Sequence, residues 1–178
     1  MEYINSENES RRKMEKGKTV CFTGHRNLSP RESAVLAQLL HAELEQQISG
    51  GAIRFRAGGA RGFDTLAAKE LLKLKCECPR LRLDLILPCP DQTKGWNMQE
   101  IREYREILSQ ADGVHYVSTG YYAGVYQLRD RALVDGSDIC IAYLRTSGGG
   151  GTAYTSAYAL RCGLRYVNLA DCMGEWLV

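Results

Sequence analysis

Four consecutive glycines, Gly148, Gly149, Gly150 and Gly151, stand directly before Thr152 and form the most informative segment of the sequence. A glycine run lets the backbone approach a ligand closely and turn several N–H groups toward one point. With a helix beginning at Thr152, the positive end of the helix dipole and the threonine hydroxyl would complete a cradle for a phosphate or another anion. The alternative is a loop that needs glycine for its turn alone. The sequence favours the anion cradle.

A second glycine-rich segment, residues 58–64 (GGARGFD), follows an apolar run in the same way. Gly58 and Gly59 suit a tight turn that brings the backbone close to a ligand. Asp64 falls in the first turn of a predicted helix, where a carboxylate is favoured by the helix dipole without any further role. The functional alternative is that Asp64 faces a pocket and accepts a hydrogen bond from a ribose hydroxyl or a base.

Further candidate side chains lie at other strand ends and on one helix. Gly24, His25 and Arg26 follow the first predicted strand, so either charged side chain could meet a phosphate, or His25 could be structural and Arg26 a solvated loop charge. Arg129 lies near the apolar face of its helix, where it could snorkel or place its guanidinium fork on a phosphate. Trp96 could stack on a base or pack over the edge of the core.

The pattern of the chain indicates the elements that must position these residues. Short apolar strands alternate with amphipathic helices, which predicts a doubly wound, mostly parallel sheet of about six strands with helices on both faces. Ser29, Pro30 and Glu32 form a capping box at the start of one helix. Ligands in such a fold bind beyond the carboxyl ends of the strands, where the strand order reverses. The predicted strands are residues 19–23, 53–57, 81–87, 114–117, 138–144 and 164–169.

Composition sets wider limits on the protein. The 178 residues are 44% apolar and 25% charged, which suits one domain (19–178) after a flexible polar tail (1–18). No secretory signal or bilayer-length apolar stretch is present, so we expect a cytoplasmic protein without a membrane partner. The seven cysteines are an odd number, and the spacing of Cys76, Cys78 and Cys89 fits no zinc pattern. We therefore expect free thiols, no metal and no cofactor.

Several motifs together resemble one protein family. The chain carries no GxSxG elbow, P-loop lysine or HExxH sequence. Its motifs do resemble the YpsA-like branch of the SLOG superfamily, which also includes the LOG phosphoribohydrolases and the DprA DNA-processing proteins, and the resemblance covers about residues 19–169. The motifs are Gly24-His25-Arg26, Gly58-Gly59-Ala60-x-Gly62-x-Asp64, Pro88 with Gln92 and Trp96, Arg129 with Val134-Asp135-x-Ser137-Asp138, and Gly149-Gly150-Gly151-Thr152-x-Tyr154-Thr155.

The resemblance implies a Rossmann-like fold with a nucleotide-sized pocket. In LOG enzymes the glycine loop reads PGGxGTxxE, and its glutamate acts with an arginine in cleaving the N-glycosidic bond of a nucleoside monophosphate. Here Ser147 stands at the proline position and Thr155 at the glutamate position, whereas Arg129 resembles the arginine. A threonine supplies neither the charge nor the base that the cleavage needs near neutral pH. The resemblance thus favours binding over turnover, with no assigned catalytic residue.

The sequence therefore predicts a protein that binds a nucleoside phosphate or an ADP-ribose-type ligand as a sensor, sequestering module or regulator. LOG-like hydrolysis of a nucleotide is one alternative. The other is DprA-like binding of single-stranded nucleic acid, which the net charge of +2 does little to support. Homo-oligomers are common for such folds, so a second copy of the chain is a further candidate partner.

Overall fold

Six parallel strands form one sheet in the order β4-β3-β2-β1-β5-β6. The structure is a computed structural model, and it describes residues 17–145 and 150–175. Each predicted strand is present, with ends that differ by at most one residue from the prediction. The strands are β1 (Lys18–Gly24), β2 (Ala52–Ala57), β3 (Arg82–Leu87), β4 (Gly113–Tyr116), β5 (Ile139–Tyr143) and β6 (Arg165–Asn168).

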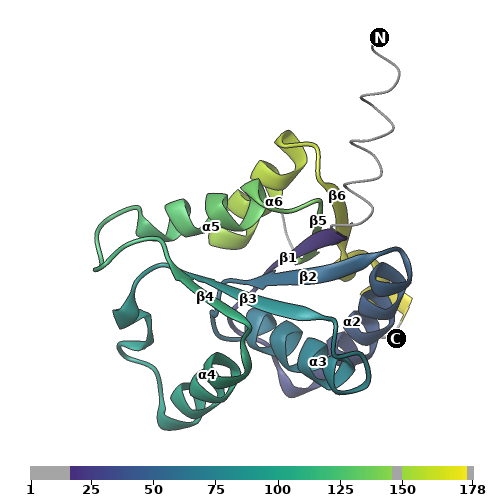
Figure 1. Cartoon of the computed structure of the whole chain (residues 1–178), viewed down its shortest axis with the longest axis horizontal. Helices are drawn as coiled ribbons and strands as arrows, with labels where there is room; N and C mark the ends of the chain where they lie inside the picture. Colours follow the sequence, from purple (N-terminus) through teal and green to yellow (C-terminus); the bar gives the residue numbers. More distant parts are fainter. Residues whose placement is uncertain (1–16, 146–149, 176–178) are drawn as a thin grey trace.

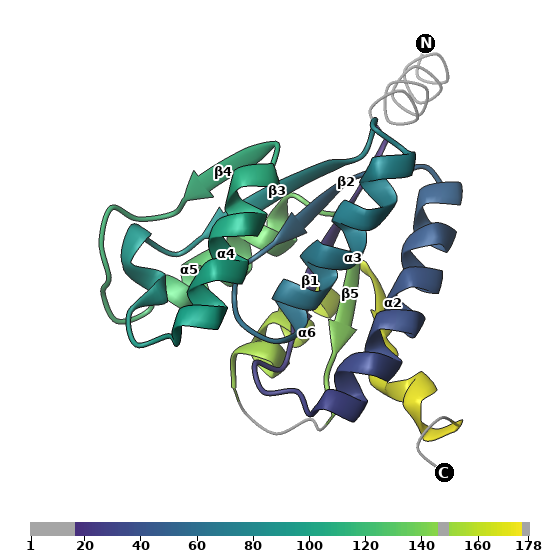
Figure 2. The same cartoon turned by 90° about the horizontal axis from the view of Figure 1, so that it is seen from below.

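Helices cover both faces of this sheet, as Figures 1 and 2 show: α2, α3 and α4 lie on one face, and α5 and α6 on the other. The predicted doubly wound fold is confirmed. No described helix is both long enough and apolar enough to span a membrane. The helices are α2 (Pro30–Ser49), α3 (Phe63–Glu77), α4 (Met98–Gln110), α5 (Val125–Asp135) and α6 (Gly151–Arg161), with short 3-10 turns at η1 (Pro90–Thr93) and η2 (Leu169–Glu175).

The central strand β1 is apolar on both sides because each side meets a helical layer. Val20 and Phe22 are fully buried in the core beneath α2 and α3, and Phe22 stacks on Phe55 of β2 with ring centroids 6.2 Å apart. Cys21 points the other way, into the smaller core beneath α5 and α6, where its strand partner is Cys140. All seven cysteines lie in the described residues and are free thiols.

The capping box predicted at the start of α2 is confirmed. The Glu32 N–H donates to Ser29 Oγ at 3.2 Å, and the Ser29 N–H donates to Glu32 Oε2 at 2.8 Å. Pro30 occupies the first helical turn, where a missing N–H costs nothing. Glu32 also accepts a hydrogen bond from the hydroxyl of Tyr143 at 2.7 Å, so this cap ties α2 to the end of β5.

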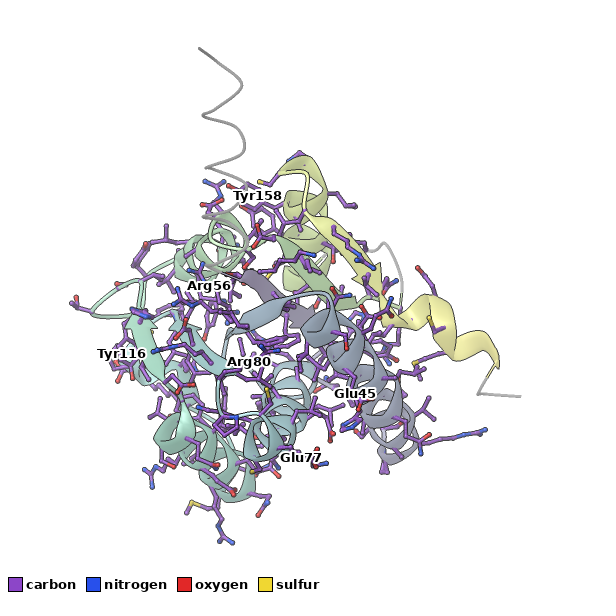
Figure 3. The ribbon with its side chains drawn as sticks, turned by 45° about the vertical axis from the view of Figure 1, so that its right-hand side comes forward. Glu45, Arg56, Glu77, Arg80, Tyr116 and Tyr158 are labelled. Atoms are coloured by element: carbon purple, nitrogen blue, oxygen red, sulfur yellow. The ribbon has the colours of Figure 1, made fainter. Side chains whose placement is uncertain are left out.

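The strand order reverses between β1 and β5. Helix α2 leads from β1 to β2 on one side, whereas α5 leads from β4, at the far edge of the sheet, back to β5 on the other side of β1. Arg56 of β2 reaches across the sheet face to this returning helix and donates to the Ala132 carbonyl at 3.4 Å (Figure 3). The starts of α3, α5 and α6 therefore converge near the carboxyl ends of β1 and β5.

Candidate functional site

A cavity of about 390 Å³ lies where the strand order reverses. Its volume falls in the range of small-molecule sites. Its walls come from the end of β1 (residues 22–26), from Ala60 and Asp64 around the start of α3, from α5, and from the first turn of α6 (residues 150–153). The position predicted from the fold is thus hollow, and it collects three of the segments picked out from the sequence.

Asp64 is held at the inner end of this cavity by the turn that precedes α3. Gly62, the N-cap of α3, takes a backbone φ of +73°, which glycine adopts readily. The Asp64 Oδ2 accepts hydrogen bonds from the N–H groups of Gly58 at 3.1 Å and Ala60 at 3.4 Å. Burial raises the pKa of Asp64 to about 6, against the opposing attraction of Arg129.

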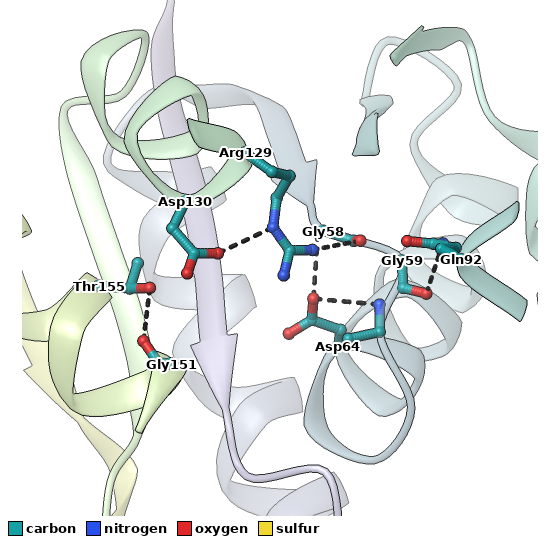
Figure 4. A network of polar contacts seen from close by, with 9 residues as sticks. Gly58, Gly59, Asp64, Gln92, Arg129, Asp130, Gly151 and Thr155 are labelled. Carbon is teal, nitrogen blue, oxygen red and sulfur yellow. Dashed lines mark hydrogen bonds and ion pairs between the residues drawn. The ribbon is translucent and has the colours of Figure 1, made fainter. Parts of the chain in front are cut away.

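Arg129 donates hydrogen bonds to one side-chain acceptor and one backbone acceptor, and Figure 4 shows this network. Its Nε donates to Asp130 Oδ1 at 2.8 Å, and its Nη1 donates to the Gly58 carbonyl. The side chains of Arg129 and Asp130 are only 7% and 8% exposed. A Cβ at Gly58 would overlap the Arg129 Nη1 atom and sit 2.8 Å from Asp64 Oδ2. Glycine is therefore required at position 58 for the approach of the arginine.

The first turn of α6 forms the opposite wall. Gly150 is its N-cap with a φ of +120°, and a glycine has no side chain to cap the helix. The first N–H groups of an α-helix have no intrahelical partner, and the first turn of α6 contains no acidic residue. Thr152 also lines the cavity. Gly150, Gly151 and Thr152 thus line the cavity, Gly148 and Gly149 lie outside the described residues, and anion binding by this segment stays a prediction.

Arg26 and Tyr126 lie together in the cavity wall. The Arg26 guanidinium carbon stands 5.3 Å from the Tyr126 ring centroid, and that of Arg129 stands 5.9 Å from it. His25 also lines the cavity, but its Nε2 accepts a hydrogen bond from the Arg145 N–H at 3.1 Å. Burial, with the charge of Arg145, holds the pKa of His25 below its usual range. A neutral His25 orders the chain here, and Arg26 supplies the positive charge.

Three residues predicted for the site, Gly58, Gly59 and Trp96, are not among the described residues that line the cavity. The Trp96 ring packs edge-on against Tyr104, with centroids 5.6 Å apart, and carries the Arg61 guanidinium over it at 5.7 Å. Gly59 adopts a φ of +63°, and its carbonyl accepts a hydrogen bond from Gln92 Nε2 at 3.1 Å. Both contacts support the turn that holds Asp64.

Asp130 and Tyr126 are cavity residues that reasoning from the sequence missed. They stand one residue after and three residues before Arg129, so all three share one face of α5. Helical spacing around Arg129 was the signal that could have found them.

The position that resembles the LOG glutamate is occupied by a hydroxyl that already has a partner. Thr155 is 1% exposed, and its Oγ1 donates to the Gly151 carbonyl at 2.8 Å. Around the cavity, Asp64 and Asp130 supply the carboxylates, and Arg129 balances one of the two charges. Across residues 17–145 and 150–175, no group of three histidine, cysteine or acidic side chains is arranged to hold a metal ion.

The fold and the cavity define a Rossmann-like α/β protein with a small-molecule-sized site at the reversal of strand order. The family model YpsA, described as the YspA SLOG family, matches residues 20–164. The chain belongs to this family, which confirms the resemblance seen in its motifs.

Curated relatives share moderate identity with the chain. A UPF0398 protein of Brevibacillus brevis is 34% identical over 105 residues, covering 58% of this chain and 52% of that protein. A UPF0398 protein of Staphylococcus epidermidis is 26% identical over 133 residues, covering 70% and 71% of the two chains. The chain thus spans about half the length of the first relative.

Two solved structures are similar in fold. DNA processing protein A from Helicobacter pylori, described for its single-stranded DNA binding mode, superposes with a TM-score of 0.59 at 18% identity, covering 92% of this chain and 74% of that one. The X-ray structure of TM1055, a structural genomics target, gives a TM-score of 0.55 at 17% identity, covering 90% and 82%. At such identities the likeness concerns the fold alone.

Proposed function

We propose that this protein binds a nucleoside phosphate or an ADP-ribose-type ligand in the cavity between β1, α5 and α6. The observation that carries the proposal is the polarity of that cavity. One wall is a helix N-terminus whose N-cap is a glycine, and the other is a pair of buried carboxylates around an arginine. A nucleotide has the matching polarity, with an anionic phosphate at one end and neutral hydroxyl groups beside it.

The phosphate is assigned to the first turn of α6. Its first N–H groups, which have no intrahelical partner, and the helix dipole attract an anion, and Thr152 adds a hydroxyl donor. Arg26 is exposed beside the cavity and brings a positive charge that has no ion-pair partner among residues 17–145 and 150–175. Arg129 is a weaker candidate for a phosphate than its sequence position suggested, because Asp130 and the Gly58 carbonyl already engage two of its nitrogens.

Binding without turnover is the favoured activity, consistent with a sensor, sequestering or regulatory role. The hydroxyl of Thr155 donates to the helix backbone and carries no charge for an oxocarbenium-like sugar. One observation supports the alternative of N-glycosidic hydrolysis: Asp64 lines the cavity with a pKa raised to about 6, which suits a proton-transferring group near neutral pH.

Thermal shift with a nucleotide panel, followed by mass spectrometry of every small molecule present, tests the proposal. The panel contains nucleoside mono-, di- and triphosphates, ADP-ribose and inorganic phosphate. A stabilising compound recovered intact supports a binder, whereas release of free base supports the hydrolase. A panel in which no compound raises the melting temperature contradicts both.

A matched pair of variants directs this test to α6. Thr152→Asp places a carboxylate in the first helical turn, where it favours the helix but competes with a phosphate. Thr152→Asn is the neutral control of nearly equal size. We expect the thermal shift to be lost in Thr152→Asp and largely retained in Thr152→Asn. Equal shifts in the two variants would place the phosphate elsewhere.

A further inference from the structure

Three polar atoms at the inner end of the cavity have no hydrogen-bond partner among the described residues. Asp64 uses Oδ2 for the two backbone N–H groups, which leaves Oδ1. Asp130 uses Oδ1 for Arg129 Nε, which leaves Oδ2. Arg129 uses Nε and Nη1, which leaves Nη2. Each of these residues is thus fixed by some of its polar atoms and has others available for a ligand.

The available atoms are accessible through the cavity. Within the described ranges, the fully buried side-chain nitrogen and oxygen atoms without a partner are Arg56 Nε and Ser156 Oγ, so none of the three belongs to that group. Asp64, Arg129 and Asp130 all line the cavity. Figure 4 shows the guanidinium lying between the two carboxyl groups, with Asp130 on the side of α6. The cavity therefore presents an acceptor, a donor and a second acceptor side by side.

This arrangement selects among the parts of a nucleotide. A phosphate at neutral pH is mainly an acceptor and would be repelled by two carboxylates. The Watson–Crick edges of the four standard RNA bases do not offer the donor–acceptor–donor order that would match. A hydroxyl group both donates and accepts, so two neighbouring hydroxyls can each donate to a carboxylate while one of them accepts from the guanidinium. A vicinal diol is the complementary group.

We propose that Asp64 and Asp130 bind the 2′- and 3′-hydroxyl groups of a ribose, and that Arg129 orients both carboxylates and donates to the diol. This inference rests on the proposed function and narrows its ligand to ribonucleotides. An acidic side chain on the ribose hydroxyls is a familiar solution in Rossmann-type sites, where one carboxylate serves. Here a second carboxylate comes from α5, and Asp130 becomes a residue that determines specificity.

The test compares ligands that differ by one hydroxyl. Isothermal titration calorimetry at pH 7.5 measures the affinity of the wild-type protein for AMP, 2′-deoxy-AMP and 3′-deoxy-AMP. Ribose 5-phosphate and 2-deoxyribose 5-phosphate repeat the comparison without a base. We expect each deoxy compound to bind at least about tenfold more weakly, because it leaves a buried charged acceptor unpaired. Equal affinities for AMP and both deoxy analogues would overturn the ribose assignment and leave nucleotide binding intact.

Variants assign the hydroxyls to their carboxylates. Asp130→Asn is expected to lower the affinity for AMP and to reduce the penalty for one of the two deoxy analogues to less than about threefold. Asp64→Asn is expected to reduce the penalty for the other analogue. Asp91→Asn, at an exposed position of η1, serves as the matched control. Circular dichroism checks that each variant is folded. If a variant is not folded, the affinities of the wild-type protein for AMP and the two deoxy analogues decide whether the ribose is bound by the two carboxylates. Failure of every ribose compound to bind would overturn the proposed function itself.

Discussion

Asp64 should lower the stability of the folded protein as the pH rises, whereas an ordinary salt-bridged carboxylate raises it. Replacing Asp64 by asparagine should remove this loss of stability. Burial raises the pKa of Asp64 from 3.8 to about 6, so the folded chain holds this proton more tightly than the unfolded chain does. The folded state therefore loses stability as the pH rises from below 3.8 to above 6. The pKa difference corresponds to about 3 kcal/mol of unfolding free energy at neutral pH.

Urea unfolding of the ligand-free protein measures this effect. About 2 kcal/mol of the penalty should develop between pH 4.5 and pH 7 in the wild type and should be absent from Asp64→Asn. Carboxylates common to the two proteins, such as Glu32, affect both alike and cancel in the difference. The free energy of Asp64→Asn relative to the wild type should thus become more favourable as the pH rises. Parallel pH profiles for the two proteins would refute the burial argument for Asp64.

Three further predictions concern the residues around Asp64 and the cap of α2. Gly58→Ala forces a Cβ into Arg129 and should lower the free energy of unfolding in urea by about 2–3 kcal/mol. Gly120→Ala is the control, because a Cβ there has no atom within 4 Å, and it should change that free energy by less than about 0.5 kcal/mol. Arg129→Met leaves Asp64 without its cationic neighbour, so carboxyl NMR titration should find its pKa above 6, and unfolding should become easier by about 3–5 kcal/mol. Hydrogen bonds from the Ser29 N–H and then the Tyr143 hydroxyl hold the pKa of Glu32 at about 2. Glu32→Gln should therefore lower the free energy of unfolding by about 1 kcal/mol above pH 4.5, and this loss should vanish as the pH falls toward 2. Three results would contradict the corresponding contacts. They are equal stability of Gly58→Ala and Gly120→Ala, an Asp64 pKa in Arg129→Met no higher than in the wild type, and a loss of stability in Glu32→Gln that does not depend on pH.

The fold was predictable because its signals are local. Six apolar runs, the glycine-rich turns and the capping box at Ser29 each depend on residues within a few positions of one another, and alternation of strand and helix then implies a parallel sheet. The rule that ligands bind where the strand order reverses pointed to the edge of the sheet at which a cavity lies. The segments that end in Arg26, Asp64 and Thr152 do line one cavity.

The roles of individual residues were harder to predict because they depend on contacts between distant parts of the chain. Gly58 and Arg129 are 71 positions apart, and their hydrogen bond explains the glycine by the approach of an arginine from α5. Trp96 stood out as an aromatic residue in a polar loop, but its ring packs on Tyr104 of α4 and does not line the cavity. Asp130 carried no motif of its own, and only the structure shows that it pairs with Arg129 and lines the cavity.

A crystal structure of the protein with AMP bound tests the central claim most directly. We predict that the phosphate lies against the first turn of α6, within hydrogen-bond distance of the first N–H groups of the helix and of Thr152. The ribose hydroxyls should lie within hydrogen-bond distance of the free oxygens of Asp64 and Asp130. A ligand bound outside this cavity, or one with its phosphate beside the two carboxylates, would contradict the account.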